Sequence, residues 1–109
     1  MNIYGQEEQK KKVAQIQERL LERQSSDLKK ILDMPEGRRL LWRILKEARI
    51  FHAHPDEAQP MAVAEGARRL GLTLFSEILS ARPESFTAMQ REAASDKLER
   101  ESELKEISQ

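Results

Sequence analysis

The residues best equipped for chemistry are two histidines, His52 and His54, which stand two positions apart beside Asp56 and Glu57. Imidazole and carboxylate groups are ligands that zinc accepts. Two histidines at this spacing without further ligands make a weak site, and Pro55 indicates that they lie on an exposed loop. The sequence contains no cysteine, which excludes disulfides and thiolate metal sites. We therefore expect a polar loop without a bound metal.

No other group of residues has the spacing of a catalytic site. Serines and carboxylates do not stand at nucleophile–base spacing, and there is no glycine-rich phosphate loop. The chain also lacks an apolar run of about twenty residues and a signal-peptide pattern. We expect a protein that is not an enzyme, needs no cofactor, is not inserted in a membrane and acts by binding.

The charges are balanced overall but unevenly placed. The 109 residues carry 19 basic and 19 acidic side chains. Residues 25–50 hold seven basic and four acidic groups, whereas residues 51–109 hold seven and eleven. Proteins that bind nucleic acid usually show a clear cationic excess. DNA is therefore the less favoured partner, although a small regulator that binds nucleic acid or a host protein through the basic face of residues 38–49 stays open as the alternative.

Trp42 is the side chain best suited to binding another protein. On a helix it lies within one turn of three cations, Arg38, Arg39 and Lys46. Tryptophan and arginine are enriched among the residues that dominate protein interfaces. Two compatible interpretations stay open: Trp42 anchors a partner, or it closes the edge of the core with a cation stacked on its ring.

Helical spacing of apolar residues predicts an all-α protein, a small bundle of three core helices near residues 35–51, 60–80 and 83–98. Amphipathic helical arms flank the bundle. We expect an N-terminal arm over residues 1–27, a compact domain over 28–92 and a charged helical extension over 93–109. The N-terminal helix should fold against the core helices or against a partner.

The N-terminal arm carries a narrow apolar stripe of Val13, Ile16 and Leu20, with Leu21 beside it. So narrow a face does not stabilise a helix in water without a partner. We therefore predict that the stripe is a second partner-binding surface. Ser25 either caps a new helical turn or lies within one continuous helix, and the sequence does not decide between them.

The first core helix has a start signal in Asp33, Pro35 and Glu36, which have the spacing of a capping box. In the second core helix, Gly66 and Gly71 each cost about 1 kcal/mol relative to alanine, which predicts close packing against a neighbouring helix. The expected buried face of the first helix is Leu40, Leu41, Ile44, Leu45, Ala48 and Phe51. That of the second is Val63, Ala67, Leu70, Gly71, Leu74, Phe75, Ile78 and Leu79.

The last helix is expected to bury its first half and expose its second half. Phe86, Met89, Ala93 and Leu98 have the spacing of a core-facing stripe. Beyond them the sequence is highly charged, which indicates a solvated helix or a fraying tail. Only a partner would cover the last apolar residues, Leu104 and Ile107.

Two glycine–arginine motifs carry a family resemblance. The first is the MPEGRR stretch at residues 34–39, which is followed by Trp42, Ile44 and Leu45. The second consists of Glu65, Gly66, Arg68, Gly71, Leu72 and Leu74. Together, over residues 28–92, they resemble the small phage-domain family typified by the nineteenth protein of a Bordetella podophage, the Bbp19-like phage domain.

The resemblance implies a phage origin and an association with the virion or its assembly, near the capsid and portal proteins. It implies no known activity. We therefore expect a bacteriophage structural or assembly protein, located in the virion or, during assembly, in the host cytoplasm. Its expected partners are phage portal or capsid proteins, and a homo-oligomer is possible.

Overall fold

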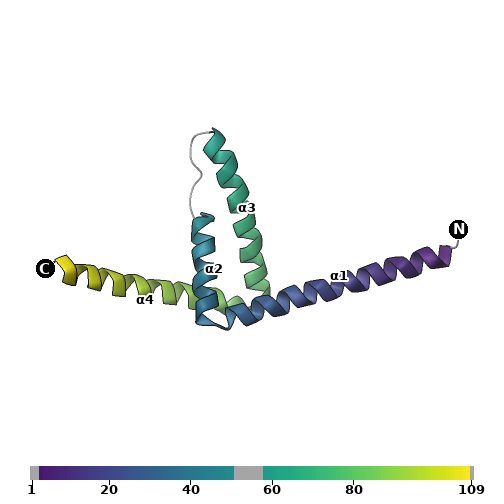
Figure 1. Cartoon of the computed structure of the whole chain (residues 1–109), viewed down its shortest axis with the longest axis horizontal. Coiled ribbons are helices and arrows are strands. Elements are labelled where there is room, and N and C mark those ends of the chain that lie inside the picture. Colours follow the sequence, from purple (N-terminus) through teal and green to yellow (C-terminus); the bar gives the residue numbers. More distant parts are fainter. Residues whose placement is uncertain (1–2, 51–57, 109) are drawn as a thin grey trace.

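The computed structural model describes residues 3–50 and 58–108, and every regular element in these ranges is an α-helix. The helices are α1 (Ile3–Leu32), α2 (Pro35–Glu47), α3 (Ala58–Ala81) and α4 (Pro83–Ser108). The described residues contain no strand, which confirms the all-α prediction. In Figure 1, α2 and α3 stand side by side on a bar formed by α1 and α4, whose far ends point in opposite directions.

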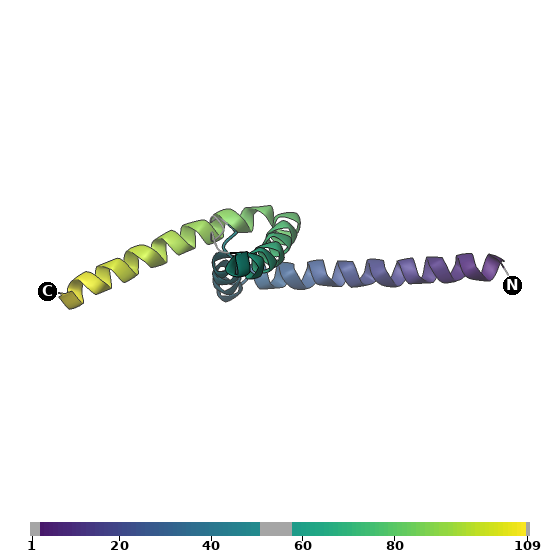
Figure 2. The ribbon, with the colours of Figure 1, turned by 90° about the horizontal axis from the view of Figure 1, so that it is seen from above.

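The molecule is extended rather than globular. It measures 81 × 39 × 18 Å, and its radius of gyration is 20.5 Å, whereas a compact chain of this length has about 13 Å. Figure 2 shows the same bar from above, with both ends far from the centre. We refer to residues 6–20 of α1 as the N-terminal arm and to residues 96–108 of α4 as the C-terminal arm, because every residue in both is exposed.

The turn between α1 and α2 is set by backbone hydrogen bonds. The Asp33 N–H donates to the Lys29 carbonyl at 2.9 Å, and the Met34 N–H donates to the Ile31 carbonyl at 3.2 Å. Pro35 then begins α2, as predicted. The predicted cap is wrong, since Met34 occupies the cap position and no side chain caps α2. Asp33 stays in the turn because α1 continues to Leu32, and its carboxylate instead accepts hydrogen bonds from Arg82, which lies between α3 and α4.

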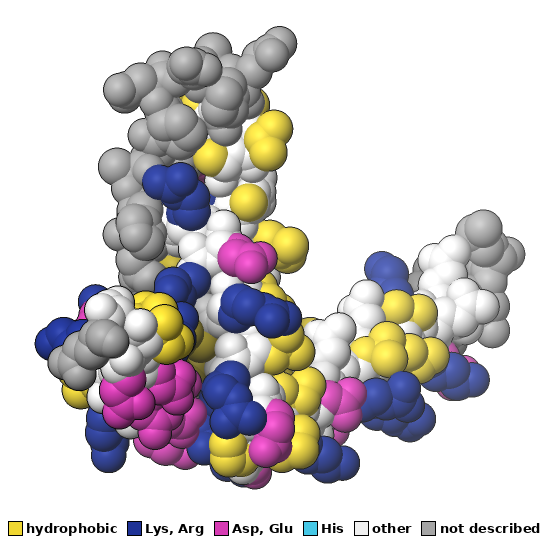
Figure 3. Space-filling model, turned by 60° about the vertical axis from the view of Figure 1, so that its left-hand side comes forward, with side chains coloured by type: hydrophobic (Ala, Val, Ile, Leu, Met, Phe, Trp, Pro, Cys, Tyr) yellow, Lys and Arg dark blue, Asp and Glu magenta, His cyan; other side chains and the backbone are white. Residues whose placement is uncertain are grey.

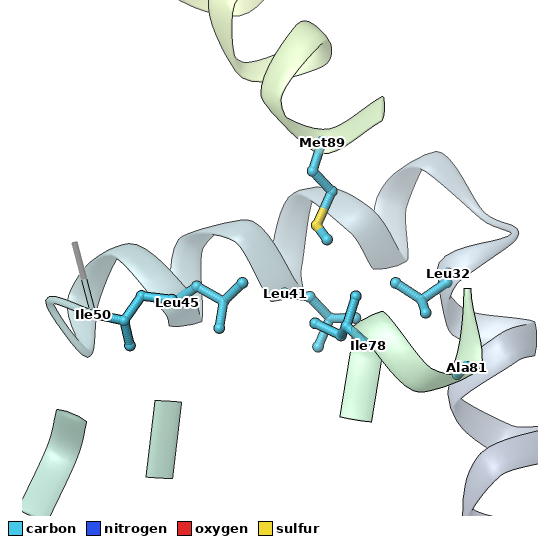
Figure 4. Close-up of a cluster of buried hydrophobic side chains, with 7 residues drawn as sticks. All are labelled: Leu32, Leu41, Leu45, Ile50, Ile78, Ala81 and Met89. Atoms are coloured by element: carbon cyan, nitrogen blue, oxygen red, sulfur yellow. The ribbon is translucent and has the colours of Figure 1, made fainter. Parts of the chain in front are cut away.

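A small core joins the four helices at the centre of the bar. Figure 4 shows Leu32 at the end of α1 in a row with side chains of α2 and α3, and Met89 of α4 pointing toward this row from one side. Leu45 and Ile78 are fully buried. The buried apolar residues are Leu32, Leu41, Leu45, Ile50, Ile78, Ala81 and Met89, with Leu28, Trp42, Ala48, Leu74 and Phe75 packed around them. The three predicted core helices are thus joined by the last turns of α1.

The buried faces are narrower than predicted, because each helix contacts its neighbours over only part of its length. On α2, Leu40 and Ile44 are 46% and 40% exposed, although they were expected inside. On α3, the expected core residues Val63, Ala67, Leu70 and Leu79 are exposed. On α4, Leu98 is exposed as well, contrary to the prediction. Phe51 lies outside the described residues.

Close packing was predicted at two glycines of α3, and it occurs at only one of them. A methyl group added at Gly71 would lie 2.5 Å from Ala48 Cβ and 2.7 Å from Ile50 Cγ2. Arg49, with φ 57°, turns the chain after α2 so that Ile50 reaches this position. At Gly66 an added methyl group would meet nothing within 4 Å. The packing prediction is therefore confirmed for Gly71 and wrong for Gly66.

Both outer helices are longer than the periodicity alone indicates. α1 continues without a break through Ser25, which decides between the two alternatives in favour of one helix. Ser25 and Leu28 are half-buried where α1 meets α3, so this contact supports the helix. α4 extends to Ser108, with Leu104 and Ile107 exposed. Among the described residues, no helix is long and apolar enough to span a membrane.

Candidate partner-binding surfaces

The predicted binding residues of α2 line one wall of an open groove between α2 and α4. Arg38, Arg39, Trp42 and Lys46 all face this groove, which has a volume of about 1170 Å³. The opposite wall belongs to residues 89–100 of α4. Its lining side chains include Gln90, Ala93, Ala94, Asp96, Lys97 and Arg100. The structure thus brings the four predicted α2 residues together and adds a second helix to the surface.

Arg38 holds the groove in shape. Its Nε donates to Glu92 Oε1 at 2.8 Å, and its Nη2 lies 2.8 Å from the same oxygen. Its Nη1 donates to the Leu32 carbonyl at the end of α1, also at 2.8 Å. The Arg38 side chain is only 18% exposed. One guanidinium therefore links α1, α2 and α4, and the angle between the groove walls depends on it.

Gly37 makes that link possible. It is buried, and a methyl group added to it would overlap the backbone carbonyl of Ile31. Glycine is the residue that allows such a close approach between two backbones. The glycine–arginine pair of the first motif therefore has a structural basis: Gly37 lets α2 cross the end of α1, and Arg38 binds the carbonyl exposed there.

Trp42 is half-buried at the base of the groove. Its ring centroid lies 6.1 Å from that of Phe86 on α4, with the two planes tilted by 40°. Phe86 in turn makes an edge-to-face contact with Phe75 on α3, with centroids 4.9 Å apart. This geometry matches the interpretation of Trp42 as a rim residue. Because it also lines the groove, it can contact a bound partner as well.

A second ion pair connects the turn between α1 and α2 with the turn between α3 and α4. Arg82 Nε and Nη2 donate to the two carboxylate oxygens of Asp33, each at 3.2 Å. The hydrogen bond to Asp33 and its negative charge raise the pKa of Arg82. A raised arginine pKa adds stability at every pH below the ordinary arginine value and loses it only above that value. Arg82 therefore contributes no pH dependence near neutrality.

The groove carries charges of both signs. Its lining includes six basic side chains and five acidic ones. The basic set is Arg38, Arg39, Arg43, Lys46, Lys97 and Arg100, and the acidic set is Glu36, Glu47, Glu92, Asp96 and Glu99. The carboxylates stand among the cations on both helices. Such a mixed surface suits a protein partner better than a phosphate backbone, which would be repelled by each carboxylate.

The second predicted surface lies on the N-terminal arm, on the far side of the core from the groove (Figure 1). Val13, Ile16 and Leu20 are 53%, 55% and 49% exposed. Figure 3 shows apolar side chains along this arm with lysine and arginine side chains next to them. We call Val13, Ile16 and Leu20 the α1 stripe. The structure keeps it apart from the groove, so the predicted residues form two separate surfaces.

The possible zinc ligands His52, His54, Asp56 and Glu57 lie outside the described residues. Within residues 3–50 and 58–108, no group of three or more histidine or carboxylate side chains has the arrangement of a metal site. Arg69 forms an ion pair with Glu65 on the same helix, with 3.7 Å between Arg69 Nε and Glu65 Oε1.

The α4 wall of the groove has a weak sequence signal. Gln90, Ala93, Lys97 and Arg100 follow each other at spacings of three and four, so they share one face of α4. Only Ala93 belongs to the predicted core-facing stripe, and hydrophobic periodicity does not mark the other three. Only the packing of Met89 and Phe86 against α2 turns this polar face toward Trp42.

A protein-family model described as Bbp19-like phage protein matches residues 28–91. No curated protein and no solved structure matches the chain. The matched segment contains the core, the α2 wall of the groove and both glycine–arginine motifs. It ends before the C-terminal arm and begins after the N-terminal arm, so the α1 stripe lies outside it.

Proposed function

The chain belongs to the family of Bbp19-like phage proteins, and from this premise we propose that it is a non-enzymatic structural or assembly component of a bacteriophage particle. It is associated with the virion, in the head interior or at the portal and head–tail region, and acts through protein–protein contacts. Its partners are phage structural proteins such as the portal or capsid protein.

The observation that carries this proposal is the excess of exposed surface. The chain exposes 9039 Å², whereas a compact monomer of 12.6 kDa exposes about 6200 Å². The difference of roughly 2800 Å² exceeds what a standard protein interface buries in total. The exposed surface includes large apolar side chains of all four helices. An extended helix assembly of this kind is suited to being covered by other proteins.

The groove is the proposed contact for a phage structural protein. Trp42 is its aromatic anchor, Leu40 adds exposed apolar surface, and Arg39 and Lys46 form a charged rim. Arg38 serves this surface indirectly by fixing α2 against α4, because its donors are already used within the chain. This arrangement of a central aromatic residue with a polar rim is typical of protein interfaces.

Mass spectrometry of purified particles tests the proposal. Particles of the phage that encodes this chain should contain it, or particle formation should fail when its gene is deleted. If particles form normally without it and purified particles lack it, the assembly proposal is wrong.

Trp42→Ala should weaken binding to the phage partner by about 2 kcal/mol or more if Trp42 is an interface hot spot. Because Trp42 also packs against Phe86, the melting temperature of the Trp42→Ala variant must be measured in parallel. The double variant Arg39→Ala/Lys46→Ala keeps that packing and should lower affinity without lowering stability. Leu70→Ala, on an exposed part of α3, is the matched control and should bind normally. Lost stability with unchanged affinity would assign Trp42 to the core alone.

The alternative is a small regulator that binds nucleic acid or a host protein through residues 38–49. The exposed cations Arg39, Arg43 and Lys46 on α2 favour it. Nucleic-acid affinity that falls steeply with salt, and that is lost in Arg43→Ala, would support this alternative. The carboxylates among these cations predict weak binding instead.

A further inference from the structure

The two arms differ in the charges that border their apolar side chains. At about 100° per residue, four of the five charged side chains that lie within a quarter-turn of a residue of the α1 stripe are basic, and the fifth is Glu8. The flanking cations are Lys10, Lys12, Arg19 and Arg23. The α1 stripe is therefore apolar at its centre and has a net positive border.

The C-terminal arm has the opposite border. Leu104 and Ile107, 62% and 81% exposed, form what we call the α4 stripe. Within a quarter-turn of these two residues lie four acidic side chains, Asp96, Glu99, Glu101 and Glu103, and two basic ones, Lys97 and Arg100. In Figure 3, where α4 points toward the viewer, carboxylates gather beside apolar side chains at its end. The two stripes thus share apolar character and have borders of opposite net charge.

The two stripes of one molecule cannot meet. The arms leave the core in opposite directions (Figures 1 and 2), and the long axis of the chain measures 81 Å. Both helices nevertheless run in the same direction along this axis, since α1 leads into the core and α4 leads out of it. A second copy displaced along the long axis would therefore lay its α1 parallel to the α4 of the first.

We propose that the α1 stripe of one copy packs against the α4 stripe of a second copy, so that the protein associates head to tail. This inference rests on the proposed function, because it names one of the partners in assembly. In the parallel arrangement Val13 lies beside Leu104 and Ile16 beside Ile107, since both pairs are three residues apart.

The same register is compatible with the surrounding charges. Arg100, one turn before Leu104, lies beside Gln9, and Lys97 lies beside Gln6, so the start of the second copy's α1 contacts the end of the groove that these two cations line. Lys10 stands diagonally across from Asp96, at the offset where parallel helices form ion pairs. No like charges are brought face to face. The contact leaves an unused α1 stripe at one end and an unused α4 stripe at the other, so it propagates into a ring or a filament.

Two blocking variants distinguish head-to-tail association from other modes. Val13→Asp/Ile16→Asp disables the α1 stripe, and Leu104→Asp/Ile107→Asp disables the α4 stripe. Val63→Asp/Leu70→Asp, on exposed positions of α3, is the control. Sedimentation equilibrium of the full chain over a range of concentrations gives the molar masses, and circular dichroism verifies that each variant is helical.

We expect the wild type and the control to gain mass with concentration, less so at high salt because opposite charges are screened. Each blocking variant alone should stay monomeric, with association at least tenfold weaker. An equimolar mixture of the two should form dimers and nothing larger, because one intact pair of stripes remains.

Three results would overturn the inference. They are a wild type that is monomeric at every concentration, a single blocking variant that still associates, or a mixture that stays monomeric. None of these decides whether the protein is in the particle, which mass spectrometry of virions tests separately.

Discussion

The core and the arms are both helical, but different forces keep them so. In the core, Leu32, Leu45 and Ile78 are buried, and each comes from a different helix. Burial supplies most of the stability of a helix in a protein. In the arms every described side chain is exposed. Pairs such as Glu7–Lys11 and Glu101–Lys105 add only about 0.2–0.5 kcal/mol each. With such small contributions the helix of each arm is only marginally stable, and contact with a partner would stabilise it.

The largest expected difference between the two regions appears on truncating a leucine in each. Leu45→Ala in the core should lower the free energy of unfolding by about 2–5 kcal/mol, because it leaves a cavity among buried side chains. Leu20→Ala in the N-terminal arm should change it by less than about 0.5 kcal/mol in the monomer. Urea denaturation at low protein concentration measures both. Similar losses would show that the N-terminal arm packs on the core.

Three glycines differ in how closely other atoms approach them. Gly37→Ala should destabilise by about 3 kcal/mol, because its methyl group meets backbone that cannot rotate away. Gly71→Ala should cost about 1–3 kcal/mol, since Ala48 and Ile50 must move. The matched control, Gly66→Ala, should stabilise by about 1 kcal/mol at its open position. Melting temperatures that rank these three variants in another order would contradict the packing described at α1 and α3.

A smaller effect is expected where the groove joins the core. Arg38→Met keeps much of the side-chain volume but removes the bonds to Glu92 and to the Leu32 carbonyl. Hydrogen bonds to charged groups contribute about 1.5–3 kcal/mol. Because the Arg38–Glu92 pair is partly exposed, we expect Arg38→Met to lower the free energy of unfolding by an amount near the lower end of this range. Urea denaturation gives the loss, and Arg39→Met, an exposed neighbour, should leave stability unchanged. An equal loss in both variants would remove the structural role of Arg38.

The sequence predicts the helices well because each has a local signal. Pro35 begins α2, Pro83 begins α4, and apolar spacing marks α3. The sequence does not predict which part of each apolar face packs against a neighbouring helix. Leu40 and Leu41 are equally apolar, yet only Leu41 points at α3 and α4. That choice depends on the angle between helices, which Gly37 and Arg38 set through contacts with α1.

The predicted surfaces show the same limit. Trp42 and its cations share a helix face in the sequence, and the structure places them on one wall. The second wall, on α4, depends on a tertiary contact through Phe86 and Met89. Likewise Asp33 has the composition of a cap, but its position in the turn directs its carboxylate to Arg82, a residue that is distant in the sequence.

We infer that the core folds by itself, whereas the helices of the arms become stable only in contact with a partner. Hydrogen exchange of the full chain, at a concentration where sedimentation shows only monomer, tests it most directly. We predict slow exchange for backbone amides in the buried parts of residues 28–92 and fast exchange in residues 6–20 and 96–108, where helices open locally. Protection from Asp96 to Ile107 as strong as that of Leu45, in a demonstrated monomer, would contradict the claim.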